Sequence, residues 1–371
     1  STDGKPWWAS IEALEGEKYI DELEKSGKEL SAADYAKARE FLRPDMIRLV
    51  QCNGILLDGP TFRNSPKFHV HPVQSENIII RNIKIITPWY AQNGDGLDLN
   101  SCRNVVVYKI MVDVGDDAIC IKPGKIGKNQ QSGPACENIV IADCEVYHAH
   151  GGFVIGSESY GGARNISVRN CIFIGTDVGL RFKSQRGRGG LIENIFVDGI
   201  QMRDIQNEAI LFDMYYGEKD TEELVASGTE LNKDNLVTHE TPIFQNFYIS
   251  NIVCHGAKRA VLLNGLPEMP LKNIQIKDTY ITSDKGVMCT NCDSIEIINC
   301  NIVSKNSPLI LINQSRNITL KKINYSLGTD LFLKVEGEKA GNIMIQDIDF
   351  SHAKKDIEIG NNAKVNAVVR K

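Results

Sequence analysis

The sequence predicts an all-β fold, a right-handed parallel β-helix (solenoid) with a short N-terminal helical cap. A motif recurs along the chain, its copies are evenly spaced, and no helical periodicity separates them. Each copy is an Asn followed by alternating β-branched or apolar residues, a turn pair and another strand-like segment. The copies begin at Asn77, Asn104, Asn138, Asn165, Asn194, Asn246, Asn273, Asn317 and Asn342, with a variant at Ser294.

The copies lie mostly 21 to 29 residues apart, and their strand-like segments are short and rich in Val and Ile. Strands of this kind indicate stacked coils instead of βαβ units. Each coil of a solenoid buries its apolar side chains against its neighbours, so the core is one continuous column. We expect the recurrent Asn at a turn, where Asn tolerates left-handed backbone geometry and its amide can hydrogen-bond along the stack.

Two spacings are longer, with 34 residues from Asn104 to Asn138 and 52 from Asn194 to Asn246. The inserted stretches are residues 122–135 and 215–240. Both are polar and contain Gly, as functional surface loops often do, so we expect them to border a site.

The N-terminal segment follows a different pattern, because its apolar residues recur at helix-like spacing among Glu and Lys. These residues are Ile11, Leu14, Tyr19, Leu23, Tyr35, Ala38 and Leu42. An open solenoid end needs a cap, and this segment is a candidate. We therefore divide the chain into an N-terminal helical cap or extension, residues 1–45, and a parallel β-helix domain expected to be catalytic, residues 46–371.

Charge and hydropathy exclude several classes of protein. A net charge of -5 and a pI near 5.9 give no basic footprint, so we expect no nucleic-acid partner. Hydrophobic residues make up 42% of the chain, and no apolar run is long enough to span a bilayer. The start, Ser1-Thr2-Asp3-Gly4, lacks the features of a signal peptide, so we expect either a cytosolic protein or one already processed.

The ten cysteines show no metal-binding pattern. The one close spacing, Cys289-x-x-Cys292, has no second pair or histidine at zinc-finger distance, so we expect no metal and no cofactor. Cys144, Cys171 and Cys300 each end an Asn-Cys or Asp-Cys step, which suits a small buried residue better than a disulfide. We therefore predict buried thiols.

Four strand-like segments share one alternation, which predicts an inner and an outer face. The residues expected to point inward are Leu97, Leu99, Ile119, Ile121, Phe153, Ile155, Leu180 and Phe182. The intervening residues would emerge on the outer face: Asp98, Asn100, Lys122, Arg181 and Lys183. Adjacent coils are about 4.8 Å apart, so residues distant in sequence become neighbours there.

Three carboxylates gather at the start of these segments, namely Asp95, Asp116 and Asp117, and His150 falls at the equivalent edge of the next coil. Like charges this close raise at least one carboxyl pKa, which leaves a proton available for a leaving group near neutral pH. Glycoside hydrolysis requires such a proton. The cations stacked above would hold an anionic sugar.

Each feature alone has a plainer interpretation. Asp-Asp pairs and Asn-Gly-Asp-Gly steps are commonly turns, outward Arg and Lys usually form a solvated face, and a lone His is more often a satisfied turn residue. Their convergence on consecutive coils favours a catalytic site.

At these residues the sequence resembles glycoside hydrolase family 28, the polygalacturonase family. The resemblance covers roughly residues 43–350; the family pattern has four blocks, and all four occur in order within that span. Asn93-Gly94-Asp95 looks like its Asn-Thr-Asp block, Gly115-Asp116-Asp117 its Gly-Asp-Asp block, Ala149-His150-Gly151 its Gly-His-Gly block, and Arg181-Phe182-Lys183 its Arg-Ile-Lys block. The positions at which this sequence differs from the family's blocks carry no group that takes part in the reaction.

The resemblance implies inverting hydrolysis of α-1,4-galacturonosyl bonds in pectin. Asp116 would be the general acid, tuned by His150, and Asp95 and Asp117 would activate water on the opposite face of the sugar. In inverting enzymes the acid and the base lie about 6.5 to 9.5 Å apart, which admits that water. The implied substrate-binding residues are Arg181, Lys183, Lys122, Tyr215, Tyr216, Asn93 and Glu158. Of these, Arg181 and Lys183 would hold the substrate carboxylate.

Three stretches look like bacterial exo-acting members of the family: residues 88–92, 151–158 and 186–190. The long loops would then close one end of the groove and confine cleavage to chain ends. Family context implies a periplasmic or secreted protein, its signal peptide trimmed. The alternatives are a hydrolase of rhamnogalacturonan or substituted pectin, a calcium-dependent pectate lyase, and a non-catalytic β-helical carbohydrate-binding protein.

Overall fold

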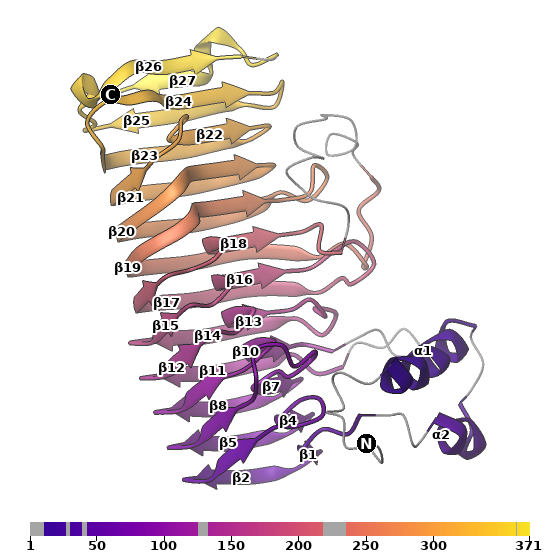
Figure 1. Ribbon diagram of the computed structural model, residues 1–371. Coiled ribbons are helices and arrows are strands. Elements are labelled where there is room, and N and C mark those ends of the chain that lie inside the picture. The colour runs from indigo at the N-terminus through magenta and orange to yellow at the C-terminus, as the bar shows by residue number, and fades with distance from the viewer. Residues whose placement is uncertain (1–10, 27–29, 39–42, 125–132, 218–234, 361) are drawn as a thin grey trace.

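The computed structural model describes residues 11–26, 30–38, 43–124, 133–217, 235–360 and 362–371. The strands lie on one another in one long stack of coils (Figure 1). Each strand pairs in parallel with its equivalent in the next coil. The prediction of an all-β, right-handed parallel β-helix is confirmed.

The first coils contain β1 (Ile47–Val50), β2 (Asn53–Asp58), β3 (Thr61–Arg63), β4 (Val70–Val73), β5 (Glu76–Arg81), β6 (Lys84–Ile86), β7 (Leu97–Asn100), β8 (Arg103–Tyr108) and β9 (Met111–Asp113). The middle coils contain β10 (Asp117–Lys122), β11 (Cys136–Ala142), β12 (Glu145–Tyr147), β13 (Gly151–Ile155), β14 (Ala163–Arg169), β15 (Ile172–Ile174), β16 (Val178–Lys183), β17 (Leu191–Arg203) and β18 (Glu208–Asp213). The last coils contain β19 (Ile243–Asn264), β20 (Leu271–Thr290), β21 (Cys292–Ser304), β22 (Ile310–Asn313), β23 (Arg316–Tyr325), β24 (Thr329–Glu336), β25 (Gly341–Gln346), β26 (Ala353–Ile359) and β27 (Val368–Arg370), with short 3-10 helices at Phe350–His352 and Val365–Ala367.

The strand pairings form parallel sheets that run along the stack. The first sheet joins β1, β4, β7, β10, β13, β16 and β18. The second joins β2, β5, β8, β11 and β14, and the third joins β3, β6, β9, β12 and β15. In the upper coils β17, β19 and β20 are longer, and each pairs in more than one of these sheets.

The residues predicted to point inward form the central column. All eight are at most 1% exposed and belong to one continuous apolar core. The register places Leu97 beside Ile119, Ile119 beside Phe153, and Phe153 beside Leu180 on successive coils. Because side chains alternate with a period of two, this register also fixes which residues emerge on the outer face.

The recurrent Asn residues form a ladder along one turn of the coils, interrupted at Ser294, where Asn317 donates to Asp293 Oδ1 at 2.7 Å. Their φ angles are positive, from 51° at Asn342 to 58° at Asn246. Side-chain amides hydrogen-bond between neighbouring coils, from 2.7 Å for Asn342 to Asn317 to 3.4 Å for Asn246 to Asn194. The ladder continues across the longest insertion, so that insertion leaves the stack undisturbed. The predicted role of these Asn residues is confirmed.

The N-terminal segment contains the two predicted helices, α1 (Ile11–Lys25) and α2 (Ala32–Ala38). Figure 1 shows both beside the lower coils. Leu42, part of the same predicted pattern, lies outside the described residues. The division at residues 45 and 46 stays a prediction.

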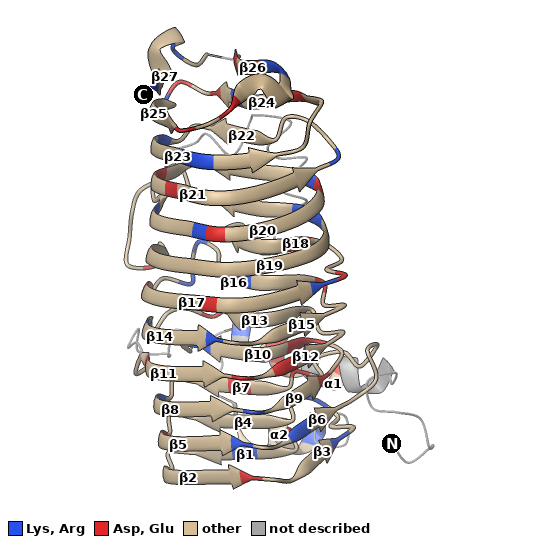
Figure 2. Cartoon of the chain, turned by 90° about the vertical axis from the view of Figure 1, so that its left-hand side faces the viewer, with Lys and Arg blue, Asp and Glu red and all other residues tan. Residues whose placement is uncertain are grey.

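All ten cysteines are free thiols, and all but the partly exposed Cys52 are buried, as predicted. Neither described helix is long and apolar enough to cross a membrane. Figure 2 shows Lys, Arg, Asp and Glu residues scattered along the strands of the second sheet, and pairs such as Arg103 with Glu76 and Arg164 with Glu137 join neighbouring coils.

Candidate active site

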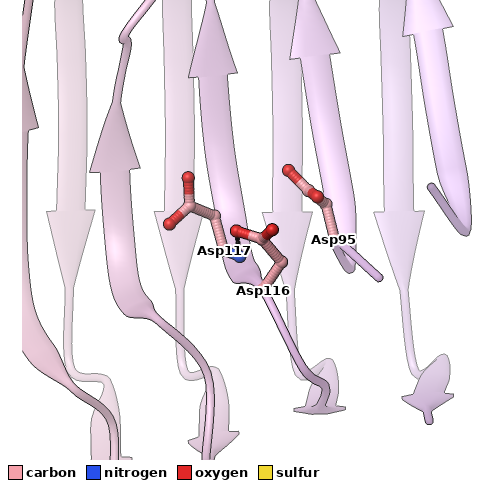
Figure 3. A group of neighbouring side chains, drawn as sticks. All are labelled: Asp95, Asp116 and Asp117. Atoms are coloured by element: carbon pink, nitrogen blue, oxygen red, sulfur yellow. Dashed lines mark hydrogen bonds between the residues drawn. The ribbon is translucent and has the colours of Figure 1, made fainter. Parts of the chain in front are cut away.

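Asp95, Asp116 and Asp117 come from two neighbouring coils of the first sheet (Figure 3). Since Leu97 of β7 pairs with Ile119 of β10, Asp95 and Asp117 occupy equivalent positions on adjacent coils. One carboxylate oxygen from each of the three residues lies within 4.8 Å of the others. The fold thus brings together the three carboxylates that the sequence placed at the strand starts.

Glycines allow the backbone to turn tightly ahead of both strands. A Cβ at Gly94 would lie 2.9 Å from the carbonyl oxygen of Ala91, and a Cβ at Gly115 would lie 2.7 Å from the same oxygen. Neither position has room for a side chain. Asn93 completes the turn with a φ of 52°, and Arg43 Nη2 donates a 2.7 Å hydrogen bond to its Oδ1.

Asp117 is buried between two cations of β16. Lys183 Nζ lies 2.7 Å from Asp117 Oδ2, and Arg181 Nη1 lies 3.2 Å from Asp117 Oδ1. Burial alone would raise the carboxyl pKa, but attraction to Lys183 and Arg181 outweighs it and holds the pKa of Asp117 well below its usual value. Asp117 is therefore ionised at the pH of ordinary solutions.

Asp95 is equally buried but has the opposite electrostatics. Burial raises its pKa to about 7; Lys122, whose Nζ lies 3.3 Å from Asp95 Oδ2, opposes the rise, and repulsion from Asp116 and Asp117 adds to it. Asp95 therefore exchanges a proton near neutral pH. A raised carboxyl pKa was expected, but its main cause is burial and not the crowding of like charges.

Asp98 is buried and the Lys122 side chain is only 13% exposed, although the sequence placed both on an outer face. Asp98 is 0% exposed, and Lys122 Nζ lies 3.4 Å from Asp98 Oδ1. The Phe68 ring covers this ion pair, with its centroid 5.3 Å from Lys122 Nζ. Burial raises the pKa of Asp98 well above its usual value, and repulsion from Asp95 adds to this. Lys122, predicted to bind substrate, is thus held by two carboxylates.

Asp116 differs from its two neighbours because it faces a cleft. Its side chain is 20% exposed, and its Oδ1 accepts a 2.9 Å hydrogen bond from the backbone N–H of Asp117. His150 Nδ1 lies 3.3 Å from the same oxygen, and His150 Nε2 lies 3.7 Å from Asp177 Oδ2. The hydrogen bond to Asp116 raises the pKa of His150, and burial opposes the rise. His150 is therefore protonated more readily than a free imidazole.

Gly151 leaves room for the contact between Asp117 and Arg181. Asp117 and Gly151 are partners in the register of β10 and β13. A Cβ at Gly151 would lie 2.5 Å from Val154 Cγ2 and 3.4 Å from both Asp117 Oδ1 and Arg181 Cδ. A side chain here would therefore crowd the ion pair.

Tyr216, and not Tyr215, reaches the cations of the site. The Tyr216 ring centroid lies 4.8 Å from Lys183 Nζ and 5.7 Å from both Arg181 Cζ and Arg188 Cζ. Tyr215 is 2% exposed within the apolar core. The sequence left the choice between the two tyrosines open. It missed Arg188, which follows a turn and has no place in the strand alternation. We call Arg181, Lys183, Arg188 and Tyr216 the cationic half of the site.

A cleft of about 830 Å³ opens beside Asp116. Its lining residues are Trp89, Tyr90, Gln92, Asn93, Gly115, Asp116, His148, Ala149, His150, Gly175, Asp177 and Gln206. Asn93, predicted to bind substrate, lines the cleft. Glu158, also predicted, is partly buried after β13 and is not among the lining residues. Sequence reasoning missed Asp177 and Gln206, because turn residues outside the strands carry no periodic signal.

The two long loops predicted to border the site are only partly described. Residues 125–132 and 218–234 lie outside the described residues. The described ends support the prediction in part, since Lys122 and Tyr216, which begin these loops, both reach the site.

A family model for glycosyl hydrolases family 28 matches residues 11–293, a span that contains the three carboxylates, His150 and the cationic half. The chain belongs to glycosyl hydrolases family 28. The four sequence blocks lie within the matched span, and the geometry above is their arrangement in this chain.

Relatives in this family carry polygalacturonase names. A probable polygalacturonase of Vitis vinifera is 28% identical over 244 residues, which are 65% of this chain and 47% of that protein. An exo-poly-alpha-D-galacturonosidase of Dickeya chrysanthemi is 27% identical over 47% of this chain and 29% of its own length. The chain spans about half the length, or less, of these curated relatives.

Solved structures of family 28 share the architecture. An exopolygalacturonase of Thermotoga maritima matches with a TM-score of 0.64 and 30% identity, over 75% of this chain and 61% of that one. A family 28 exopolygalacturonase of Yersinia enterocolitica matches with a TM-score of 0.56 over 95% of this chain and 52% of that one. At 18% identity, this second likeness concerns the fold alone.

Proposed function

We propose that this family 28 protein hydrolyses α-1,4-galacturonosyl bonds of pectin. One observation carries the proposal: Asp116 faces the cleft, while two buried carboxylates behind it have pKa values shifted in opposite directions. Glycosidases need two carboxyl groups of different protonation at one bond. The polygalacturonase names of the relatives support the choice of pectin.

Asp116 is the proposed general acid that protonates the glycosidic oxygen. It is the member of the trio that lines the cleft, so a bound sugar can reach it. The positive charge that His150 gains beside it stabilises the carboxylate formed when the proton leaves. His150 acts through Asp116 and is a positioning residue in this scheme.

Asp95 is the proposed main base that activates water, with Asp117 beside it. A base works best when its pKa lies near the working pH, which describes Asp95 better than the strongly ionised Asp117. The nearest oxygens of the trio, within 4.8 Å, are closer than the separation of about 6.5 to 9.5 Å expected for inversion. The proposal of inversion therefore rests on the family resemblance, and polarimetry of the first products tests it.

The cationic half is the proposed site for the carboxylate of galacturonate. Three cations surround Tyr216; Asp117 forms ion pairs with two of them, and Asp116 and Asp213 add negative charge near Arg181. A guanidinium can bind a carboxylate through two parallel hydrogen bonds, which favours Arg181 for this role. Lys183 is mainly a counter-ion of Asp117 and sets the local potential.

Exo-action is proposed from the likeness to exo-acting relatives. A periplasmic or secreted location is proposed on the same family grounds. We propose no metal or cofactor for the reaction, because Lys122, Lys183 and Arg181 already supply positive charge next to Asp95 and Asp117.

The test is product analysis on defined oligogalacturonides, with wild type beside Asp116→Asn. We expect the wild type to release saturated monomer and Asp116→Asn to lose at least about a hundredfold in rate. The control is Asp330→Asn, which alters an exposed aspartate paired with Lys354 in the upper coils and should keep full activity.

The rival reactions give different results in the same assay. Unsaturated products that vanish on adding EDTA would replace hydrolysis by a calcium-dependent lyase reaction. Binding without cleavage, unchanged in Asp116→Asn, would indicate a carbohydrate-binding protein. Activity confined to rhamnose-containing oligomers would move the substrate to rhamnogalacturonan.

A further inference from the structure

We propose that Arg43 is a positioning residue of the active site. It holds the side-chain amide of Asn93 by its oxygen, so that the amide N–H groups face the cleft and donate to an oxygen of the substrate. Arg43 lies before the first strand and outside the four sequence blocks. The inference rests on the proposed function and adds to it a residue that acts through Asn93.

The guanidinium of Arg43 binds the turn ahead of β7 at two points. Its Nη1 donates a 2.8 Å hydrogen bond to the carbonyl oxygen of Gln92, and its Nη2 donates the 2.7 Å bond to Asn93 Oδ1. Arg43 is 5% exposed and is not among the lining residues, whereas Gln92 and Asn93 are exposed and line the cleft. Arg43 therefore holds this wall of the cleft from its buried side.

The chemistry of arginine determines which way the Asn93 amide faces. A guanidinium has five N–H donors and no acceptor, so the amide atom that Nη2 contacts must be the oxygen. The amide nitrogen then points away from Arg43, and it has no hydrogen-bond partner among the described residues. Because Asn93 is exposed at the cleft, its two N–H groups are available to an acceptor oxygen of a bound sugar.

The backbone is fixed on both sides of this contact. Asn93 has a φ of 52° and precedes Gly94, which has no room for a side chain. Two residues after Arg43, Asp45 Oδ2 lies 2.7 Å from His71 Nδ1, and these two side chains are only 9% and 7% exposed. A contact between groups that are already anchored costs little ordering entropy, so it can hold an amide in one orientation.

A plainer role for Arg43 would be to staple the turn without affecting the substrate. The staple requires only the two acceptor oxygens, of Gln92 and Asn93, that the guanidinium binds. The proposed role requires in addition that Asn93 present N–H donors to the cleft. A substitution that keeps the oxygen and removes the donors therefore distinguishes the two roles.

Two substitutions of Asn93 make this distinction. Asn93→Asp keeps the oxygen that Arg43 binds and tolerates the positive φ, but it has no N–H donor. Asn93→Gly also tolerates the φ, and it removes the oxygen and the donors without adding a charge. Calorimetry measures binding of trigalacturonate in the Asp116→Asn background, where cleavage does not interfere. We expect each variant to weaken binding about tenfold or more, the effect of one or two hydrogen bonds.

Substitutions of Arg43 test whether it sets the orientation. Arg43→Gln introduces a side chain that both donates and accepts, so the Asn93 amide can turn over and binding should weaken about tenfold. Arg43→Lys still only donates, so binding should stay within about threefold of the parent. In the Asn93→Gly background, Arg43→Gln should cause no further loss, because the group through which it acts is already gone.

Matched controls repeat the same substitutions away from the site. Arg103→Gln alters an exposed arginine paired with Glu76 on the second sheet of the lower coils. Asn362→Asp alters an exposed turn residue with a φ of 64° near the C-terminus. Neither control should change the binding of trigalacturonate.

Two results would overturn the role of Arg43 and leave the hydrolase intact. Unchanged binding in Asn93→Gly would mean that Asn93 makes no contact with the substrate. Equal losses from Arg43→Gln with Asn93 present and with Asn93→Gly would mean that Arg43 does not act through Asn93.

Failure of the proposed function gives a different result. If trigalacturonate does not bind to the parent, the proposed function fails, and urea unfolding still decides whether Arg43 holds the amide. Asn93→Asp should then be more stable than Asn93→Gly, because it keeps the oxygen that Arg43 binds, and the difference should shrink in the Arg43→Gln background. A difference that stays the same rejects the orientation of Asn93 by Arg43.

Discussion

The outer faces of the first and second sheets follow the same alternation, yet they carry charge in opposite ways. On the first sheet Asp98 is 0% exposed and the Lys183 side chain 5%. On the second sheet Arg164 and Glu137 pair at 3.0 Å with side chains 49% and 29% exposed. The alternation along a strand therefore determines which face of the sheet a side chain is on. The segments that cover that face determine whether the side chain is exposed to solvent.

This difference separates structural from chemical use of charge. Exposed ion pairs contribute little to stability, whereas buried ions are costly unless each has a partner. Buried charges with shifted pKa values concentrate where chemistry occurs. In this chain they lie at Asp95, Asp98 and Asp117, around the residue that faces the cleft.

The largest effect is expected when a buried pair on the first sheet is broken. Lys183→Met leaves Asp117 buried with one cation fewer, which should lower the free energy of unfolding by about 3 to 5 kcal/mol and abolish activity. Urea unfolding measures the loss. The double variant Lys183→Met with Asp117→Asn should recover part of the stability, because the buried carboxylate is gone and only the partly exposed Arg181 loses its partner, while staying inactive. An additive double variant would contradict the pairing.

The next effect is a displaced pH profile. Catalysis by Asp95 as base needs its ionised form, so kcat/KM should rise with pH through the Asp95 pKa of about 7. Lys122 lowers that pKa, so Lys122→Gln should move this limb to higher pH by about 1 to 3 units. Profiles from pH 4 to 10 measure the shift. An unmoved limb would assign the base to another group.

The same group gives a signed prediction for stability. The folded pKa of Asp95, about 7, exceeds the usual value of 3.8, so between these values the folded state holds a proton that the unfolded state has lost. The Asp95 contribution to stability therefore falls as pH rises from about 4 to 7. Asp95→Asn should flatten this part of the stability curve, as measured by urea unfolding at successive pH values.

A smaller effect is expected at His150. Asp116 raises the pKa of His150, so the imidazolium is lost as pH rises above the usual value of 6.5. If the imidazolium supports Asp116, activity should decline on the alkaline side, and His150→Gln should lower kcat about tenfold and remove that decline. KM should change little, because His150 acts through Asp116. A lower kcat with an unchanged alkaline limb would indicate a purely structural role.

The repeat made the fold predictable, because the same sequence motif recurs in successive coils. The positions of Asn104, Leu97 and Phe153 follow from period and alternation alone. The carboxylates could be predicted equally well, since Asp95 and Asp117 lie at equivalent positions of adjacent coils. The burial of Asp98 could not be predicted, because it depends on the segments that cover this face of the sheet, and strand alternation does not reveal them.

Turn residues were the other part of the site that could not be predicted from the sequence. Trp89, Asp177 and Arg188 belong to no strand, so neither period nor alternation points to them. The choice of Tyr216 over Tyr215 needed the end of β18 at Asp213, which the sequence does not mark. In a β-helix the pattern thus predicts the frame of a site, and three-dimensional structure is needed for its walls.

The smallest effect on stability is expected when an exposed ion pair on the second sheet is broken. Arg164→Ala breaks the exposed pair with Glu137, and because both charges stay hydrated the free energy of unfolding should change by at most about 0.5 kcal/mol. Activity should be unchanged. Any small effect should disappear in 1 M salt, which screens surface charges beyond about 3 Å, whereas the loss in Lys183→Met should persist there. Equal salt sensitivity of the two variants would mean that Asp117 is solvated and that the contrast between the two faces is wrong.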